Sequence, residues 1–246
     1  MSESKQIIIT GISSELGGIL ARELAKERGV KIIGTMRRKR TVKDKFPRNI
    51  HLLDGCDLTK PECCSKVSTA AERLFKGRFG LIHCVGDFWH HVPFLECDPK
   101  KAKTMFESHV TTLYNTLQSL IPIMKGRKGG SVVAFSCNST LYHYPWMTAF
   151  TASKSAVDSI ITSLANEYSG DNLRFNSLRL SSLKTEPVRR SKPHGDFVHF
   201  TPPGHIVPVV RFLLSPEAYL VNGNTISIFK HSDEFYRQGY FERVSK

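Results

Sequence analysis

Short apolar runs alternate along this chain with longer segments of helical spacing. Runs such as Ile7–Ile9 contain no polar alternation, which is typical of strands buried on both faces. The expected strands are Lys5–Gly11, Val30–Met36, His51–Asp57, Phe79–Val85, Ser131–Ser136, Leu173–Leu180 and Thr225–Phe229. The expected helices are Leu16–Arg28, Ser65–Phe75, Lys100–Met124, Thr148–Tyr168 and Pro203–Leu214. This order predicts an α/β fold with a doubly wound parallel sheet flanked by helices.

The domain organisation follows from length and from the lack of breaks. No Gly/Ser-rich linker or repeat interrupts the pattern, so residues 1–246 are expected to form a single domain. The tail 231–246 is polar and rich in aromatic residues. It could pack on a neighbouring subunit or lie over the site, and its sequence does not decide between these.

Composition narrows the class of protein. The net charge is +13, but no helix-turn-helix, zinc finger or RNA-recognition signature accompanies it, so a nucleic-acid partner is not expected. No apolar run is long enough for a signal sequence or a membrane span. The six cysteines show no Cys-x-x-Cys and no metal-like spacing with His, which indicates reduced thiols in the cytoplasm and no metal site.

A glycine loop joins the first expected strand to the first expected helix. The segment Thr10–Gly17 reads TGISSELG, with glycines at Gly11 and Gly17. In this context, backbone N–H groups and a helix N-terminus can bind a pyrophosphate. Glu15 stands where a third glycine would complete the loop; its carboxylate partly opposes a phosphate and also complements the helix dipole.

This loop, the element order and the segment FTASK (150–154) resemble the short-chain dehydrogenase/reductase family across residues 5–230. The family's loop reads Thr-Gly-x-x-x-Gly-x-Gly and its catalytic segment reads Tyr-x-x-x-Lys. The resemblance implies a Rossmann-like fold, a nicotinamide cofactor, and a homodimer or homotetramer formed through the two long helices.

The resemblance also assigns the cofactor contacts. Arg37 and Arg38 end the second strand, where an acidic residue would bind the ribose of NAD, and they favour the 2′-phosphate of NADP(H) instead. The implied cofactor-binding residues are Gly11, Ser13, Leu16, Gly17, Arg37, Arg38, Asp57, Leu58, Gly86, Lys154, Leu183 and Thr185.

The positions that correspond to the family's catalytic residues differ from the family pattern more than the cofactor-binding positions do. The family's Asn, Ser, Tyr and Lys correspond to His109, Cys137, Phe150 and Lys154. A phenyl ring carries no exchangeable proton, so Phe150 cannot act as a general acid or base. Ser136 is one residue away from the Ser position, and we expect its side chain to face the other side of the strand.

Other side chains could supply the missing proton. His109, with an ordinary pKa of about 6.5, would allow proton transfer near neutrality. Tyr142 and Tyr144 lie in a loop that borders the substrate pocket in the family. Asp87, Trp89, His90 and His91 also follow a strand at its carboxyl end. Each of these could equally be a pocket wall or an exposed loop residue.

The segment 186–194 corresponds to the family's substrate lid. Its cations Arg189, Arg190 and Lys192 could recognise an acidic or phosphorylated small molecule, or could simply be solvated.

Three functions remain open from the sequence. The chain could be a divergent NADPH-dependent reductase in which His109, Tyr142, Tyr144 or water supplies the proton. It could be a non-redox enzyme, such as an isomerase or cyclase, that uses NADP as a structural element. It could also be a non-catalytic module that senses NADP(H).

Overall fold

The computed structural model describes residues 5–41, 45–87, 92–191, 194, 197 and 200–229. The predictions for Trp89, His90, His91, Lys192 and the tail 231–246 fall outside these residues.

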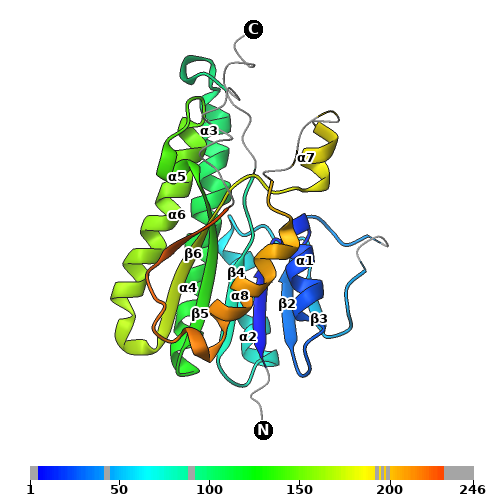
Figure 1. Cartoon of the computed structure of the whole chain (residues 1–246). Helices are drawn as coiled ribbons and strands as arrows, with labels where there is room; N and C mark the ends of the chain where they lie inside the picture. The colour runs from blue at the N-terminus through cyan, green and yellow to red at the C-terminus, as the bar shows by residue number, and fades with distance from the viewer. Residues whose placement is uncertain are drawn as a thin grey trace.

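Seven parallel strands form one sheet in the order β3-β2-β1-β4-β5-β6-β7 (Figure 1). The strands are β1 Gln6–Thr10, β2 Lys31–Thr35, β3 Ile50–Leu53, β4 Phe79–His83, β5 Gly130–Cys137, β6 Leu173–Leu180 and β7 Thr225–Ile228. The order steps outward from β1 in one direction and from β4 in the other. This is a doubly wound, Rossmann-like sheet, as the sequence predicts.

The central strands are buried on both faces, which explains their unbroken apolar runs. Every residue of β1 and of β4 is buried. Ile8 pairs in register with Ile33 of β2 and with Leu81 of β4, and all three belong to one core cluster. Ile7 and Ile9, which flank Ile8 in β1, point to the opposite face of the sheet and belong to a second core cluster.

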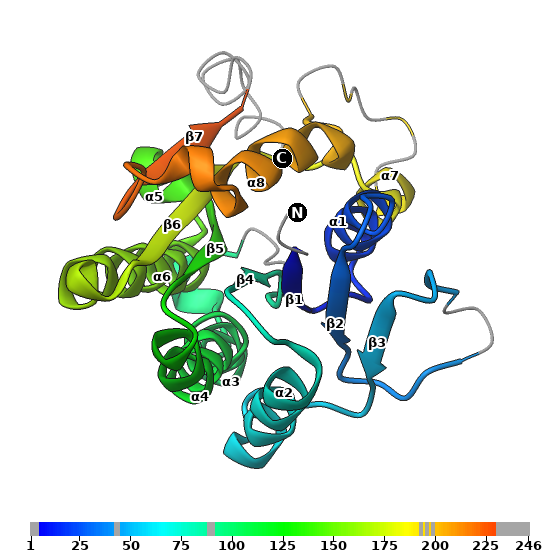
Figure 2. The same ribbon diagram turned by 90° about the horizontal axis from the view of Figure 1, so that it is seen from below.

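Helices cover both faces of the sheet (Figure 2). The helices are α1 Glu15–Leu24, α2 Pro61–Leu74, α3 Pro99–Phe106, α4 Thr112–Gly126, α5 Ser139–Tyr142, α6 Thr148–Glu167, α7 Glu186–Ser191 and α8 Val207–Leu214. Helices α1 and α8 lie on one face, and α2, α4 and α6 lie on the other. Short 3₁₀ turns at 94–96, 169–171, 203–206 and 216–218 complete the elements.

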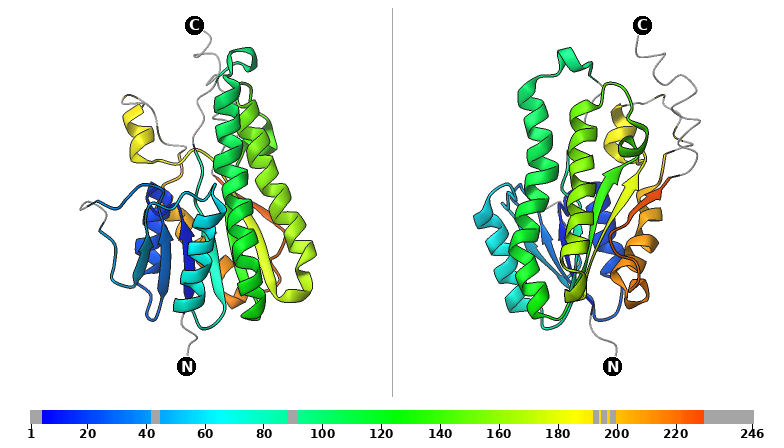
Figure 3. Two further views of the ribbon diagram at one scale, coloured as in Figure 1. Left: turned by 180° about the vertical axis from the view of Figure 1, so that it is seen from behind. Right: turned by 90° about the vertical axis from the view of Figure 1, so that its left-hand side faces the viewer.

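The predicted long helix over Lys100–Met124 contains an unpredicted π-helical turn. Helices α3 and α4 form one rod beside α6 (Figure 3), joined by the π turn Glu107–Thr111. A π turn inserts an extra residue into the helical ladder and re-aims the side chains around it, and such turns occur often at functional sites. His109 is the buried residue of this turn.

Other helix boundaries differ from the predicted ones. Helix α1 ends at Leu24 rather than Arg28, and the residues after it form turns up to Gly29, which has a φ of 77°. Helix α2 begins at Pro61, because proline suits the first helical position. The short α5 and α7 lie within loops and have no periodic pattern long enough to predict them. Within the described ranges, none of the helices has the length and apolarity needed to cross a membrane.

Candidate functional site

The glycine loop turns sharply between β1 and α1. Gly11 has a φ of +68°, and a Cβ on it would lie 3.0 Å from the carbonyl of Cys84. A Cβ on Gly17 would lie 2.5 Å from the Gly11 oxygen. The Ser14 hydroxyl caps the helix by accepting the Gly17 N–H at 3.0 Å and donating to the Gly11 carbonyl at 2.8 Å. These contacts explain why both glycines stand here, and they leave the start of α1 at the carboxyl edge of the sheet.

Two further residues of this loop were predicted to bind cofactor. Ser13 is exposed at the turn. The side chain of Leu16 is buried in the core beneath α1, so only its backbone N–H is available to a ligand.

The predicted cofactor-binding residues after β2 and β3 differ in exposure and in hydrogen bonding. Arg37 and Arg38 are exposed immediately beyond β2. Asp57 accepts hydrogen bonds from the backbone N–H of Thr59 at 3.1 Å and from its hydroxyl at 2.9 Å. The side chain of Leu58 is 3% exposed and packs in the core, so its predicted cofactor contact stays a prediction that would involve its backbone.

The segment after β6 lies at the same edge of the sheet. Leu183 forms a parallel bridge with Thr201, and the Thr185 N–H donates to the Leu183 carbonyl at 2.9 Å. Both Leu183 and Thr185 are half-buried. Helix α7 begins directly after them, where Arg189 and Arg190 lie 3.8 and 2.9 Å from the carboxylate of Glu186.

Lys154 is the one tetrad position at which this chain has the residue type that the resemblance implies, and α6 holds it inside the protein. Its side chain is 9% exposed, and Nζ donates to the Phe135 carbonyl at 2.9 Å. Nζ also lies 6.0 Å from the centre of the Phe150 ring. Burial lowers the pKa of the Lys154 ammonium from 10.5 to about 8, although the nearby Cys137 and Asp158 oppose the shift.

His109 is held as a neutral ring. The Ser153 hydroxyl donates to the Phe150 carbonyl at 2.8 Å and lies 2.9 Å from His109 Nδ1. His109 Nε2 lies 3.1 Å from the Asp87 amide nitrogen and 3.0 Å from the Asp87 carbonyl oxygen, so the tautomer of the ring decides which of the two it bonds. Burial, followed by the charge of Lys154, lowers the pKa of His109 to about 2. The expectation of proton transfer by His109 near neutrality is therefore wrong.

Gly86 makes room for that histidine. A Cβ on Gly86 would lie 2.9 Å from the His109 ring and 3.5 Å from Lys154 Nζ. The His109 ring also meets the Phe150 ring edge to face, with 5.4 Å between centres. The glycine that the resemblance assigns to a cofactor ribose thus has a packing reason as well.

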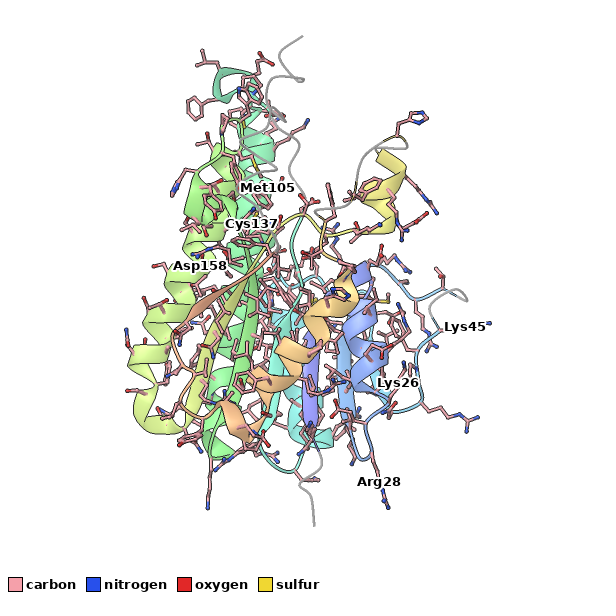
Figure 4. The ribbon with its side chains drawn as sticks, in the orientation of Figure 1. Lys26, Arg28, Lys45, Met105, Cys137 and Asp158 are labelled. Carbon is pink, nitrogen blue, oxygen red and sulfur yellow. The ribbon has the colours of Figure 1, made fainter. Side chains whose placement is uncertain are left out.

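A second hydrogen-bonded group surrounds Cys137 at the end of β5, where Figure 4 labels it near Met105. The Cys137 thiol donates to Asn138 Oδ1 at 3.3 Å, and Asn138 Nδ2 donates to the Tyr144 hydroxyl at 3.2 Å. Asn138 is 1% exposed. Tyr144 and Cys137 both pack on the buried cluster of Met105, Met147 and Phe150.

The two predicted tyrosines are not equivalent. The Tyr144 ring lies in this cluster, whereas Tyr142 is 37% exposed and stacks on Tyr144 with 5.7 Å between ring centres. The loop that carries Tyr144 is bounded by left-handed residues at His143 and Trp146, with φ of 50° and 62°.

Ser136 faces α6, away from Cys137, as predicted. Its hydroxyl donates to Asp158 at 2.8 Å, and the Ser177 hydroxyl donates to the other Asp158 oxygen at 2.7 Å. Arg179 lies 3.6 Å from the same carboxylate. Neither Asp158 nor Asn138 was predicted as a site residue. A carboxylate four residues after Lys154, in a helix with an apolar face toward the sheet, was the available signal for Asp158.

Comparison with known proteins agrees with this architecture. The family model for short chain dehydrogenases matches residues 5–195. A tropinone reductase homolog of Arabidopsis thaliana is 25% identical over 240 residues, covering 91% of this chain and 90% of the relative. Dehydrogenase/reductase SDR family member 4 of Rattus norvegicus is 24% identical over 246 residues, covering 92% and 86%.

Two solved structures share the fold at low sequence identity. A tyrosine-to-phenylalanine variant of ElxO with NADPH bound superposes with a TM-score of 0.83 at 18% identity, covering 92% of this chain and 97% of that one. L-sorbose reductase from Gluconobacter frateurii, complexed with NADPH and L-sorbose, has a TM-score of 0.79 at 22% identity, covering 92% and 95%. With the doubly wound sheet and the glycine loop at its carboxyl edge, the family-model match shows that this chain belongs to the short-chain dehydrogenase family.

Proposed function

We propose that this chain binds NADP(H) at the carboxyl edge of its sheet and acts as an atypical oxidoreductase with a remodelled proton-donor site. The observation that carries the proposal is the glycine loop, where Gly11 and Gly17 allow a turn that opens at the start of α1. Arg37 and Arg38 add two exposed guanidinium groups beyond β2. The solved relatives that contain NADPH give further support.

The residues present suit a phosphorylated dinucleotide. Backbone amides at the start of α1 can bind a pyrophosphate, and guanidinium groups can pair with a 2′-phosphate. Lys154 and Thr185 offer further donors for the nicotinamide half. When bound, NADP(H) supplies or accepts a hydride. Glu15 is the one carboxylate in the loop that opposes this fit.

Reduction of a carbonyl also requires a proton, and Tyr144 is the side chain best suited to supply it. Phe150 has no proton to give, and His109 stays neutral with its ring nitrogens engaged. The Tyr144 hydroxyl is linked through Asn138 to the Cys137 thiol, and its ring packs on Phe150. In this proposal Asn138 is a positioning residue, because it orients both the phenol and the thiol.

The first test is fluorescence titration with NADPH and NADH. We expect NADPH to bind roughly tenfold or more tightly than NADH, because a guanidinium–phosphate pair contributes on the order of 1.4 kcal/mol or more. Replacing Arg37 and Arg38 with Ala should remove this preference. Failure of both nucleotides to bind at high micromolar concentration would contradict the proposal.

The second test separates the two tyrosines. With NADPH and a panel of aldehydes, ketones and quinones, Tyr144→Phe should lower turnover roughly 100-fold, the scale of a lost general acid. Tyr142→Phe, the matched control at the exposed tyrosine that ends α5, should change turnover less than about threefold. Phe150→Tyr should raise turnover. NADPH binding without turnover in any variant would favour the non-redox enzyme or the sensing module.

The substrate, the assembly and the compartment complete the proposal. We propose a small-molecule substrate, a cytoplasmic setting and a homodimer or homotetramer. An apolar hollow of about 230 Å³ between α3 and α6, beside the 71% exposed Phe94, supports an association surface on the two long helices. Light scattering across protein concentration tests the assembly, and a monomer throughout would contradict it.

A further inference from the structure

Glu15 makes a contact that its position at the start of α1 does not predict. Its carboxylate oxygen Oε2 accepts the backbone N–H of Glu186 at 2.6 Å. The contact joins residues 171 positions apart, from the glycine loop to the first residue of α7. In Figures 1 and 2, α7 lies beside the beginning of α1. The glycine loop and the lid segment are therefore tied directly to each other.

The carboxylate lies among groups that suit an anion. Glu15 is the first residue of α1, where unpaired backbone N–H groups and the helix dipole stabilise negative charge. Glu186 follows Thr185, the residue that the family resemblance assigns to a cofactor phosphate. The neighbouring cations Arg189 and Arg190 pair with the side chain of Glu186.

A pyrophosphate bound at the start of α1 would meet this carboxylate. Both are anions, so each lowers the affinity of this region for the other by like-charge repulsion. If cofactor binding weakens the Glu15–Glu186 contact, loss of that contact must strengthen cofactor binding by the same factor, because coupled equilibria are reciprocal.

We propose that Glu15 is an internal anion that latches the lid segment α7 to the glycine loop and competes with the cofactor pyrophosphate. In this proposal, the Glu15–Glu186 contact and a bound cofactor oppose each other. Glu15 thereby sets cofactor affinity and couples it to lid order. This inference rests on the proposed NADP(H) function for its second half only, since the latch itself is a contact within the chain.

The latch is tested first without cofactor, by amide hydrogen exchange at Glu186. Glu15→Ala removes the acceptor, and exchange at this amide should become about tenfold faster, the change expected for loss of one charge-assisted hydrogen bond. Glu15→Gln keeps an acceptor oxygen, so exchange should rise less than about threefold. Glu23→Gln, an exposed change on the same helix, is the control and should leave exchange unchanged. Equal exchange in wild type and Glu15→Ala would overturn the latch.

Competition is then tested by NADPH titration of the same variants. Glu15→Gln and Glu15→Ala should each bind NADPH about three- to fivefold more tightly, the scale of one charge at a helix N-terminus. Glu23→Gln should bind like wild type. Unchanged or weaker binding in both Glu15 variants would overturn the competition. If no variant binds NADPH, the proposed cofactor and the competition both fail, while the exchange data still decide whether the latch exists.

Discussion

The side of the sheet that is proposed to bind the cofactor and the side that resembles the family's catalytic site differ in how closely they match the family pattern. Around β1 and α1, recognition depends on backbone amides and on glycines that leave room for the turn. Around β5 and α6, chemistry depends on side-chain atoms, and three of the four positions that resemble the family tetrad carry other residues. Only Lys154 keeps its type.

The difference teaches that backbone-based sites tolerate sequence change better than side-chain-based sites. A backbone N–H is supplied by any residue except proline, so the loop needs only its glycines and its cap. A proton donor must carry a particular atom at a particular place. On the catalytic side, His109 is bonded to Ser153 and Cys137 to Asn138, whereas the buried hydroxyls of Ser139 and Thr151 have no hydrogen-bond partner among the described residues.

The largest expected effect is a loss of folding stability at acidic pH, and it comes from buried histidines, among them His109 on the catalytic side. Burial lowers the pKa of His109 to about 2 and of His83 to about 3, whereas both bind a proton near pH 6.5 in the unfolded chain. Their contribution to stability is therefore present above pH 6.5 and is lost as the pH falls toward 3. Between pH 7 and 5, we expect a loss on the order of 3 kcal/mol in the free energy of unfolding.

Urea denaturation at each pH measures this loss. His109→Asn, which restores the family residue type, should reduce the loss by about half. An equal loss in wild type and in this variant would show that His109 does not titrate as the buried ring requires.

A smaller effect is expected from Gly17→Ala, which tests the cofactor side. The added Cβ would lie 2.5 Å from the Gly11 carbonyl oxygen, a backbone atom that cannot move without distorting the loop. We expect the free energy of unfolding to fall by about 2 kcal/mol. The affinity for NADPH should also fall, because the amides at the start of α1 would shift.

Thermal denaturation and NADPH titration check this prediction. Gly126→Ala is the control, because a Cβ there meets no atom within 4 Å and alanine favours a helix. If Gly17→Ala bound NADPH as tightly as wild type, the loop would not be the phosphate site.

The smallest expected effect has the opposite sign. Lys154 is charged and buried, and its pKa is lowered to about 8, so it destabilises the folded protein at neutral pH. Lys154→Met should raise the free energy of unfolding by about 1 kcal/mol while weakening NADPH binding. Wild type should gain stability as the pH rises from 8 to 10.5, and the variant should not. A variant that is less stable at pH 7 would indicate that the bond to Phe135 outweighs the cost of burial.

Much of the fold could be predicted because local patterns determine it. Apolar patterning located all seven strands, although β3 ends at Leu53 and not at Asp57, and the glycine loop located the start of α1. The π turn at Glu107–Thr111 could not be predicted, since its residues fit the same helical periodicity as their neighbours. Helix α7 could not be predicted either, because its six residues are too few to show a helical hydrophobic period.

The amino-acid sequence by itself determined the parallel α/β fold, the glycine loop and the loss of a phenol at Phe150, since each follows from residue types and their spacing. Only the tertiary structure decided that His109 is neutral, that Asn138 connects Cys137 to Tyr144, and that Glu15 reaches Glu186. The physical reason is that protonation and hydrogen-bond partners depend on burial and on contacts between distant segments. Glu15 and Glu186 are 171 positions apart, so no local sequence pattern predicts the hydrogen bond between them.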